Sequence, residues 1–382
     1  MKIVGVETFQ VAPRWLFCKI STDEGVEGWG EPIVEGRAAT VRAAVHELAA
    51  LLIGQDPRTV EAHWQRLSKA GFYRGGPILS SAVAGLDQAL WDILGKSLGA
   101  PVHQLLGGAV RDRIRVYGWI GGDEPSAVTE AALAAVDGGL TAVKMNGTGL
   151  FPPGANPRAM FEAAERVHAV RAAVGDEIDI AVDLHGRVGP ADARRLLSLL
   201  EPAHPLFVEE PVLPEFAHRL ETLVQHSTIP IATGERLYSR TEFLPALQAG
   251  IAVAQPDLSH AGGISEVRRI AALADTFGAL LAPHCPLGPI ALAASLQIAA
   301  STPNFLIQEQ SLGIHYNAGS AELLDYLLDP APLRISQGWL PTPTAPGLGL
   351  VIDEEAVRAA DSAGHDWHNP VWAHPDGSFA EW

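Results

Sequence analysis

The feature that most constrains the fold is a regular alternation of short apolar segments and longer helical patterns, which begins near residue 113. The strand candidates are RIRVYGWIGG (113–122), LTAVKMNG (140–147), EIDIAVDLHG (177–186), PLFVEEP (205–211), IPIATGER (229–236), IAVAQPD (251–257), GALLAPHC (278–285) and NFLIQEQ (304–310). Between them lie segments such as 125–139, 191–202 and 264–278, with apolar residues at three- and four-residue steps. Eight such units predict an α/β fold of the (β/α)8 barrel type. An open, doubly wound sheet is the rival fold, but no glycine-rich phosphate fingerprint opens the series.

The chain ahead of this region has a different organisation. Three strand-like segments come first and three helical patterns follow, as expected for an α+β module. The strand-like segments are 2–11, 16–25 and 26–32, and the helical ones are 37–54, 57–71 and 77–99. We therefore predict a capping domain at 1–112, a catalytic barrel at 113–320, and a C-terminal segment at 321–382 that packs back on the cap.

Ionisable residues mark the ends of six consecutive strand candidates. They are Asp183 and His185, Glu209 and Glu210, Glu235 and Arg236, Asp257, His284, and Glu309. The strand ends follow one another at intervals of 22 to 27 residues, which is one strand–helix unit each time. One such residue alone would be a solvated loop residue, but six in succession predict a shared site at the C-terminal mouth of the barrel.

Three of these residues indicate a metal. Asp183, Glu209 and Glu235 come from adjacent strands and would repel one another without a cation. Oxygen donors, with no cysteine and no close histidine pair, suit Mg²⁺ rather than Zn²⁺. Glu210 is an alternative to Glu209, although its side chain should point toward the helices.

Two histidines accompany the carboxylates. Asp183 and His185 are two residues apart, so on a strand both side chains would point to the same face. His185 and His284 are the candidate acid and base, and Asp257 is placed to pair with His284 and raise its basicity.

Composition narrows the possible functions. The chain has 382 residues, with 27 Lys and Arg against 44 Asp and Glu, giving a formal net charge of −17. This balance argues against nucleic-acid binding but not against an anionic substrate, because a metal ion can dominate the local field. No apolar run approaches a membrane span, and the N-terminus lacks the layout of a signal peptide. Two cysteines, Cys18 and Cys285, fit a reducing cytoplasm rather than a disulfide framework.

The motifs around these residues resemble those of a known family. Three carboxylates on successive strands behind an α+β cap resemble the enolase superfamily, and QPDLSHAGG (255–263) and HCPLGPIA (284–291) resemble its mandelate racemase subgroup. The segments FYRGGPI, ALWDILGK, VDLHGRV, EEPVLPE and IQEQSLGIHYN are similar to sugar-acid dehydratases of that subgroup, and the similarity spans essentially the whole chain. The resemblance implies a lyase that removes water from a sugar acid and leaves a 2-keto-3-deoxy acid.

The resemblance also implies roles for the matching residues. Asp183, Glu209 and Glu235 match the ligands of one Mg²⁺ per subunit. His185 matches the general acid that serves the leaving hydroxyl, and His284 matches the general base that takes the C2 proton.

Four further residues complete the implied site. Asp257 corresponds to the residue that enhances the base, and Glu309 to the group that hydrogen-bonds the developing enediolate. Racemases of this group often carry Lys-x-Lys on the second strand, whereas this chain has Lys144 and Asn146. The absence of a second basic lysine favours elimination over racemisation.

Substrate contacts and assembly are less constrained by the sequence. Lys144 and Asn146 are candidate substrate-binding residues, and the cap loops offer Arg14, Trp15, Tyr73 and Arg74 for the distal hydroxyls. We expect a small sugar acid as the partner, no nucleic acid or membrane, and a homo-oligomer. A dehydratase for another diastereomer remains an alternative, as does a binding protein without turnover. An intact acid–base set argues against the binding protein, because binding alone needs neither group.

Overall fold

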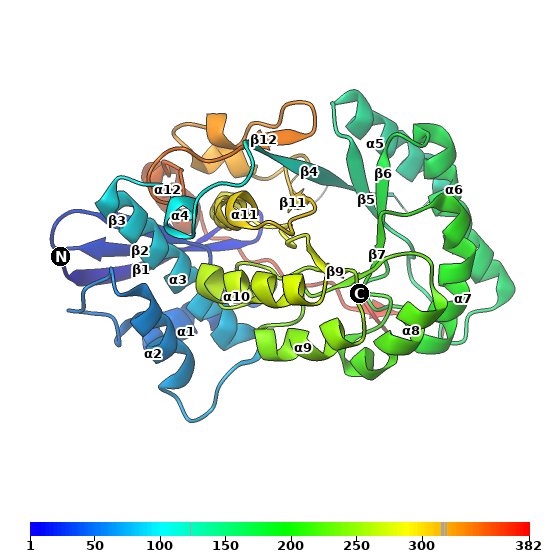
Figure 1. Ribbon diagram of the computed structural model, residues 1–382, viewed down its shortest axis with the longest axis horizontal. Coiled ribbons are helices and arrows are strands. Elements are labelled where there is room, and N and C mark those ends of the chain that lie inside the picture. Colours follow the sequence, from blue (N-terminus) through cyan, green and yellow to red (C-terminus); the bar gives the residue numbers. More distant parts are fainter. Residues whose placement is uncertain (123, 315–316, 318) are drawn as a thin grey trace.

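The computed structural model describes residues 1–122, 124–314, 317 and 319–382, so His315 and Tyr316 of the IQEQSLGIHYN motif lie outside the described residues. An antiparallel sheet opens the chain, in the order β1 (Ile3–Val11), β2 (Trp15–Thr22), β3 (Glu27–Gly30). The helices that follow are α1 (Ala38–Ala49), α2 (Val60–Lys69), α3 (Gly76–Leu98) and α4 (Val102–Leu105). The predicted α+β cap is confirmed, and Figure 1 shows it in blue and cyan at one end of the molecule.

A curled sheet of parallel strands forms the second part of the molecule. Its strands are β4 (Arg113–Ile120), β5 (Ala142–Asn146), β6 (Asp179–Asp183), β7 (Phe207–Glu209), β8 (Ile231–Thr233), β9 (Val253–Ala254), β10 (Leu280–Leu281) and β11 (Gln308–Gln310). They pair in the order β10-β9-β8-β7-β6-β5-β4-β11. A parallel bridge between Leu281 and Phe305 joins the two ends of this order. Each predicted strand therefore contains an observed one, and the barrel fold is confirmed.

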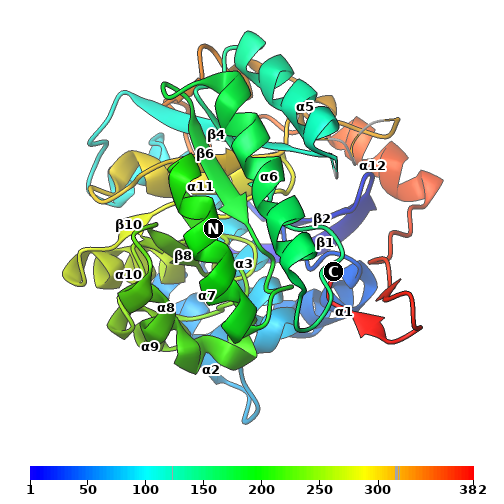
Figure 2. The same cartoon turned by 90° about the vertical axis from the view of Figure 1, so that its right-hand side faces the viewer.

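Helices lie between successive barrel strands and cover the outside of the barrel (Figure 2). They are α5 (Pro125–Asp137), α6 (Pro157–Val174), α7 (Pro190–Leu200), α8 (Leu220–His226), α9 (Arg240–Gln248), α10 (Gly263–Thr276) and α11 (Pro289–Ser301), with the short 3₁₀ turns η1 (Glu201–Ala203) and η2 (Pro214–Arg219) before β7 and α8. Proline stands at the first position of α5, α6, α7 and α11, where its missing N–H costs no helical hydrogen bond.

The chain after β11 departs from the regular pattern. In the described residues it forms a 3₁₀ turn, η4 (Leu323–Tyr326), where a strictly regular barrel would have an eighth outer helix. The Tyr326 hydroxyl donates to the carbonyl oxygen of Ala12 at 2.8 Å, and its ring packs edge-on against Trp15. This segment therefore packs on the cap as well as against α11, in place of an eighth outer helix, which makes the fold a modified barrel.

The C-terminal residues contact both the barrel and the cap. They comprise η5 (Ala331–Leu333), β12 (Trp339–Pro341), which pairs antiparallel with β4, α12 (Glu354–Ala363), and the hairpin β13 (Trp372–Ala373) and β14 (Phe379–Ala380). In α12, Glu354 accepts a 2.7 Å hydrogen bond from Lys19 of β2, and Asp361 accepts a 2.7 Å hydrogen bond from the backbone N–H of Gln10. The cap is thus assembled from both ends of the chain. Among the described residues, no helix is both long enough and apolar enough to cross a membrane.

The barrel interior has its own apolar layer, separate from the larger core outside the strands. Each strand, or the residue beside it, contributes one fully buried side chain: Tyr117, Ala142, Ala181, Phe207, Ala232, Val253, Ala282 and Ile307. Two large rings and small alanines share this space, and the Tyr117 and Phe207 rings meet edge-on at 6.4 Å. This layer, which we call the inner ring, fills the barrel below its C-terminal mouth.

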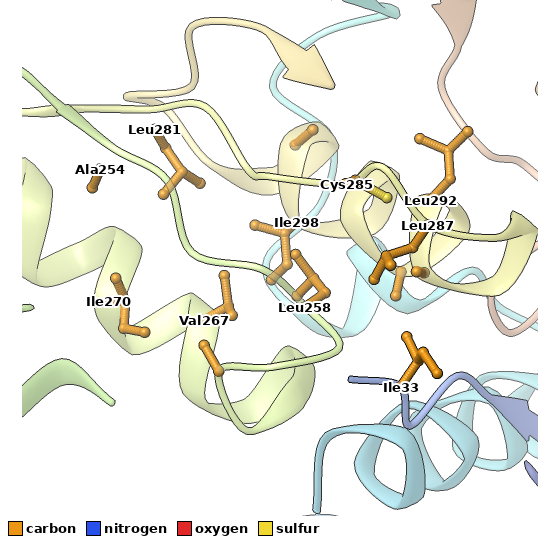
Figure 3. Close-up of a cluster of buried hydrophobic side chains, with 14 of the residues drawn as sticks. Ile33, Ala254, Leu258, Val267, Ile270, Leu281, Cys285, Leu287, Leu292 and Ile298 are labelled. Carbon is orange, nitrogen blue, oxygen red and sulfur yellow. The ribbon is translucent and has the colours of Figure 1, made fainter. Parts of the chain in front are cut away.

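The outer core connects the barrel to the cap. Figure 3 shows Leu258, Val267 and Ile298 packed together between the loop after β9 and the helices α10 and α11. Ile33, which follows β3, lies at the cap side of the same cluster near Leu287. The cap is therefore fastened to the barrel by buried apolar contact close to the loop that carries His284.

Sheet and helix approach closely inside the cap. A Cβ atom on Gly30 of β3 would lie 2.7 Å from the carbonyl carbon of Gly85 in α3 and would overlap its carbonyl oxygen. Gly30 is therefore required by the close approach of the α3 backbone, which cannot yield by rotating a side chain.

We predict that Gly30→Ala destabilises the protein by roughly 1–3 kcal/mol or more, the usual cost of overpacking. Thermal unfolding followed by circular dichroism measures the effect. Gly5→Ala is the matched control, because its new methyl group would meet no atom within 4 Å. Equal melting temperatures for the two variants would contradict the packing argument.

Candidate active site

A layer of polar side chains lies directly above the inner ring. Lys144, Asp183 and Glu209 each stand two residues beyond a member of the inner ring, on β5, β6 and β7. Because side chains alternate along a strand, a residue two positions on points to the same side, here into the barrel. Glu309 of β11 and His284 stand in the same relation to Ile307 and Ala282.

Three carboxylates converge in this layer. One oxygen of each of Asp183, Glu209 and Glu235 lies within 4.8 Å of the others. Glu235 follows Gly234, which has a φ of +148° and faces the Phe243 ring so closely that a Cβ atom would come within 2.6 Å of it. Asp183 and Glu209 are almost completely buried, and the Asp183 Oδ2 atom accepts no hydrogen bond from the described residues. This set of hard oxygen donors fits a divalent cation.

Glu210, the alternative ligand, is turned away from this cluster. It has a φ of +42°, is 1% exposed, and accepts a 3.1 Å hydrogen bond from Nε of Arg236. The geometry therefore groups Glu209, rather than Glu210, with Asp183 and Glu235.

Lys144 supplies a fixed positive charge beside the carboxylates. Its Nζ lies 2.9 Å from Glu209, 2.8 Å from Glu309 and 3.7 Å from Asp183. Burial alone would lower the pKa of Lys144, but Glu209 and Glu309 raise it well above its usual value. One ammonium does not balance the cluster, since burial and then Asp183 still hold the pKa of Glu209 well above that of an ordinary glutamate.

His284 is held between two carboxylates. Its Nδ1 lies 2.8 Å from Asp257 and its Nε2 lies 3.1 Å from Glu235. Burial lowers the pKa of His284, but Glu235, Glu309 and Asp257 together raise it well above 6.5. Glu309 also accepts a 2.9 Å hydrogen bond from the backbone N–H of Cys285, which fixes the segment that carries the histidine.

His185 lies just beyond the end of β6 and contacts Asp183, whereas His284 contacts Glu235 and Asp257. His185 has a φ of +48°, so the expectation that it shares a strand face with Asp183 is wrong. The two residues still meet, because the tight turn brings Nε2 of His185 to 3.2 Å from Asp183. Burial lowers the pKa of His185, against the opposing effects of Asp183 and Glu235.

The remaining predicted residues are dispersed. Asn146 ends β5, and its buried Oδ1 accepts no hydrogen bond from the described residues. Trp15 belongs to β2 and is completely buried against Phe17, so its expected place in an irregular loop is wrong. Tyr73 is 86% exposed, and Arg74 donates to Gly71 within the same surface loop.

Two cap residues reach the loop after His284. Arg14 of the cap donates a 3.4 Å hydrogen bond to the carbonyl oxygen of Pro286 in the barrel. Glu31, which sequence reasoning missed, accepts hydrogen bonds from the backbone N–H groups of Gly288 and Ala291 at 2.7 and 2.9 Å. These groups open α11, where a carboxyl oxygen satisfies otherwise unpaired donors. Burial nevertheless raises the pKa of Glu31 to about 8.

His260 is a second residue that sequence reasoning missed. Its Nε2 lies 3.9 Å from Asp257 and 3.7 Å from Glu35 of the cap, and its Nδ1 lies 3.2 Å from the Ser81 hydroxyl. The sequence signal that points to His260 is its position three residues after Asp257 within QPDLSH.

Comparison with known proteins places this geometry in a family. Residues 4–107 match the mandelate racemase / muconate lactonizing enzyme N-terminal domain, and residues 127–356 match the enolase C-terminal domain-like family. The chain belongs to the mandelate racemase / muconate lactonizing enzyme family of the enolase superfamily.

Relatives of known name extend over the full length. The chain is 54% identical to a D-galactonate dehydratase of Ralstonia nicotianae and 52% identical to one of Variovorax paradoxus, each covering 100% of both chains. Among solved structures, an enolase from Agrobacterium radiobacter with bound Na and L-malate matches with a TM-score of 0.92 and 34% identity, covering 100% of both chains. An enolase superfamily member from Salmonella Typhimurium matches with a TM-score of 0.86 and 32% identity, over 94% of this chain and 97% of that one.

We predict that Asp183→Asn and Glu235→Gln each weaken binding of a divalent cation by at least about tenfold, the effect of losing about 1.4 kcal/mol. Titration calorimetry with Mg²⁺ and Mn²⁺ measures the affinity. Glu215→Gln is the matched control, because this carboxylate is exposed in the connection after β7. Wild-type affinity in both site variants would contradict the assignment of the ligands.

Cation affinity should also rise with pH. Because a ligand carboxylate must be ionised, the raised pKa of Glu209 makes cation binding compete with protonation of this side chain. Binding should therefore release protons and strengthen by up to about tenfold per pH unit for each proton displaced. Calorimetry at pH 6 and pH 8, in buffers of different ionisation enthalpy, detects both effects. An affinity independent of pH, with no proton release, would be evidence against this linkage.

Proposed function

We propose that this chain is a Mg²⁺-dependent hydro-lyase that converts D-galactonate to 2-dehydro-3-deoxy-D-galactonate and water. The observation that carries the proposal is a cluster of three carboxylates between two histidines. His284, which pairs with Asp257, stands on one side, and His185, which contacts Asp183, stands on the other. The full-length identity to D-galactonate dehydratases supports the substrate.

The carboxylates define where the substrate would be activated. Asp183, Glu209 and Glu235 would hold the Mg²⁺, which stabilises the negative charge that develops on the substrate carboxylate when C2 loses its proton. The Lys144 ammonium lies against the same carboxylates and adds a fixed positive charge to this region. Glu309, 2.8 Å from Lys144, would hydrogen-bond the developing enediolate as the protonated carboxylic acid, since an ionised carboxylate can only accept hydrogen bonds.

His284 is the general base in this mechanism. Asp257 accepts a hydrogen bond from Nδ1, which orients the ring and leaves Nε2 to take the C2 proton. In the metal-free protein Glu235 is the largest influence that raises the pKa of His284. With Glu235 engaged as a ligand, that influence weakens and the neutral base is favoured.

His185 is the general acid that protonates the departing 3-hydroxyl. Burial lowers its pKa, so its imidazolium gives up a proton more readily than an ordinary histidine. Asn146 stands where the resemblance would place a second basic lysine in a racemase. The chain thus carries one base. An elimination needs only one base, whereas a two-base racemisation needs a second.

Location and assembly are part of the proposal. Cys18 and Cys285 are both unpaired and buried, which supports a reducing cytoplasm. We further expect a homo-oligomer, to be tested by light scattering at several protein concentrations.

In a screen of aldonic and aldaric acids with Mg²⁺, D-galactonate should be the best substrate. The readout is the 2-keto-3-deoxy acid, detected by its carbonyl chemistry. Faster turnover of D-gluconate or of an aldarate would support dehydratase activity but contradict D-galactonate as the best substrate. Binding without any keto acid would favour the sugar-acid-binding alternative.

The two histidines should be separable in heavy water. His185→Asn should still exchange deuterium into C2 of unreacted substrate while forming little keto acid, because a base remains but the leaving group is not protonated. His284→Asn should do neither. Rapid exchange by His284→Asn with none by His185→Asn would reverse the two assignments.

A further inference from the structure

The backbone around His185 is held by groups from three different strands. The His185 N–H donates to Asp183 Oδ1 at 2.8 Å, and the His185 carbonyl oxygen accepts from a terminal nitrogen of Arg236 at 3.2 Å. The next N–H, that of Gly186, donates to the carbonyl oxygen of Glu210 at 2.9 Å. A non-glycine residue in the left-handed region is disfavoured on its own, so these contacts define where the imidazole lies.

Arg236 and Glu210 form the far side of this arrangement. Arg236 donates to both carboxylate oxygens of Glu210, through Nε at 3.1 Å and through a terminal nitrogen. Burying such a pair costs desolvation that its attraction only partly recovers, so it is weak evidence for stability alone. The planar guanidinium is needed because it engages the carboxylate and the His185 carbonyl at once, which an ammonium cannot do with the same geometry.

The arginine also packs directly against the turn. A Cβ atom on Gly186, which has a φ of +65°, would lie 2.9 Å from the Arg236 guanidinium and 2.8 Å from the Leu213 side chain. The turn therefore has little room to move toward Arg236, and a shift of the guanidinium would shift His185.

We propose that the Arg236–Glu210 pair, which we call the brace, is a positioning device for His185 and thereby sets the efficiency of 3-hydroxyl expulsion. The inference rests on the proposed function, since it takes His185 as the acid. The brace contacts the His185 backbone directly, and an Arg236→Lys variant keeps the positive charge that lies 3.9 Å from Glu235. It should affect elimination more than C2 proton removal, which belongs to His284 on the other side of the carboxylates.

The test measures two rates in heavy water with Mg²⁺ and D-galactonate: keto acid formation, and deuterium exchange at C2 of unreacted substrate. Arg236→Lys keeps the charge and loses the fork, and should slow elimination by up to about 100-fold, as a displacement near 1 Å can. Exchange should fall much less, so the ratio of exchange to elimination should rise at least about tenfold. Glu210→Gln should change the ratio in the same direction.

Arg240→Lys is the matched control. Arg240 lies four residues further on, at the start of α9, and pairs at 3.6 Å with another buried carboxylate, Glu266; in the described part of the chain it makes no hydrogen bond or ion pair with the turn after β6. Its ratio should equal that of the wild type. Adding Arg236→Lys to His185→Asn should leave the ratio as it is in His185→Asn alone, because effects through one residue are not additive.

An unchanged ratio of exchange to elimination in Arg236→Lys, whether both rates fall together or neither falls, would contradict the proposed role of the brace. If Arg236→Lys does not fold, the same ratio is measured for Glu210→Gln and for the double variant Glu210→Gln/His185→Asn, and the same outcomes support or contradict the proposal. Failure of the proposed function is distinguishable, because the wild-type protein would then show neither keto acid nor exchange before any variant is compared.

Discussion

Mutual repulsion among buried carboxylates is the constraint on which the rest of the site depends. Asp183, Glu209 and Glu309 are buried and Glu235 beside them is only partly exposed, so water screens their charges weakly and their energy depends on the positive groups nearby. Lys144 and His284 each approach them within about the length of a hydrogen bond or salt bridge. A divalent cation completes the balance. The strands, the turns after them and the cap contacts hold these charges in place.

Much of this arrangement was predictable because two simple periodicities coincide. The strand–helix repeat places every strand end at the same mouth, and the two-residue alternation places polar side chains directly above the inner ring. Asp183 above Ala181 and Glu209 above Phe207 follow from these rules alone. The alternation also separates Glu209 from Glu210.

What could not be predicted depends on tertiary contacts that have no local pattern. His185 leaves the strand with a positive φ, stabilised by Arg236, a residue 51 positions away in the chain. Trp15 looked like a loop residue because the length of β2 is set by its pairing with β1, where Trp15 faces Val11. Glu31 acquires its hydrogen-bond partners, and His260 its contacts with Glu35 and Ser81, only when the cap and the barrel meet.

The assembly of the cap from both ends of the chain has a consequence for biosynthesis. The first strands leave the ribosome well before Asp361, which accepts a hydrogen bond from the Gln10 N–H across 351 positions. Contacts this distant in sequence form slowly, because the intervening chain must first be closed into a loop. The barrel between them can fold as its own unit while translation continues. The contact between β1 and α12 can therefore form only after α12 has been made, whereas the barrel partners of Arg14 and Glu31 precede α12 in the chain.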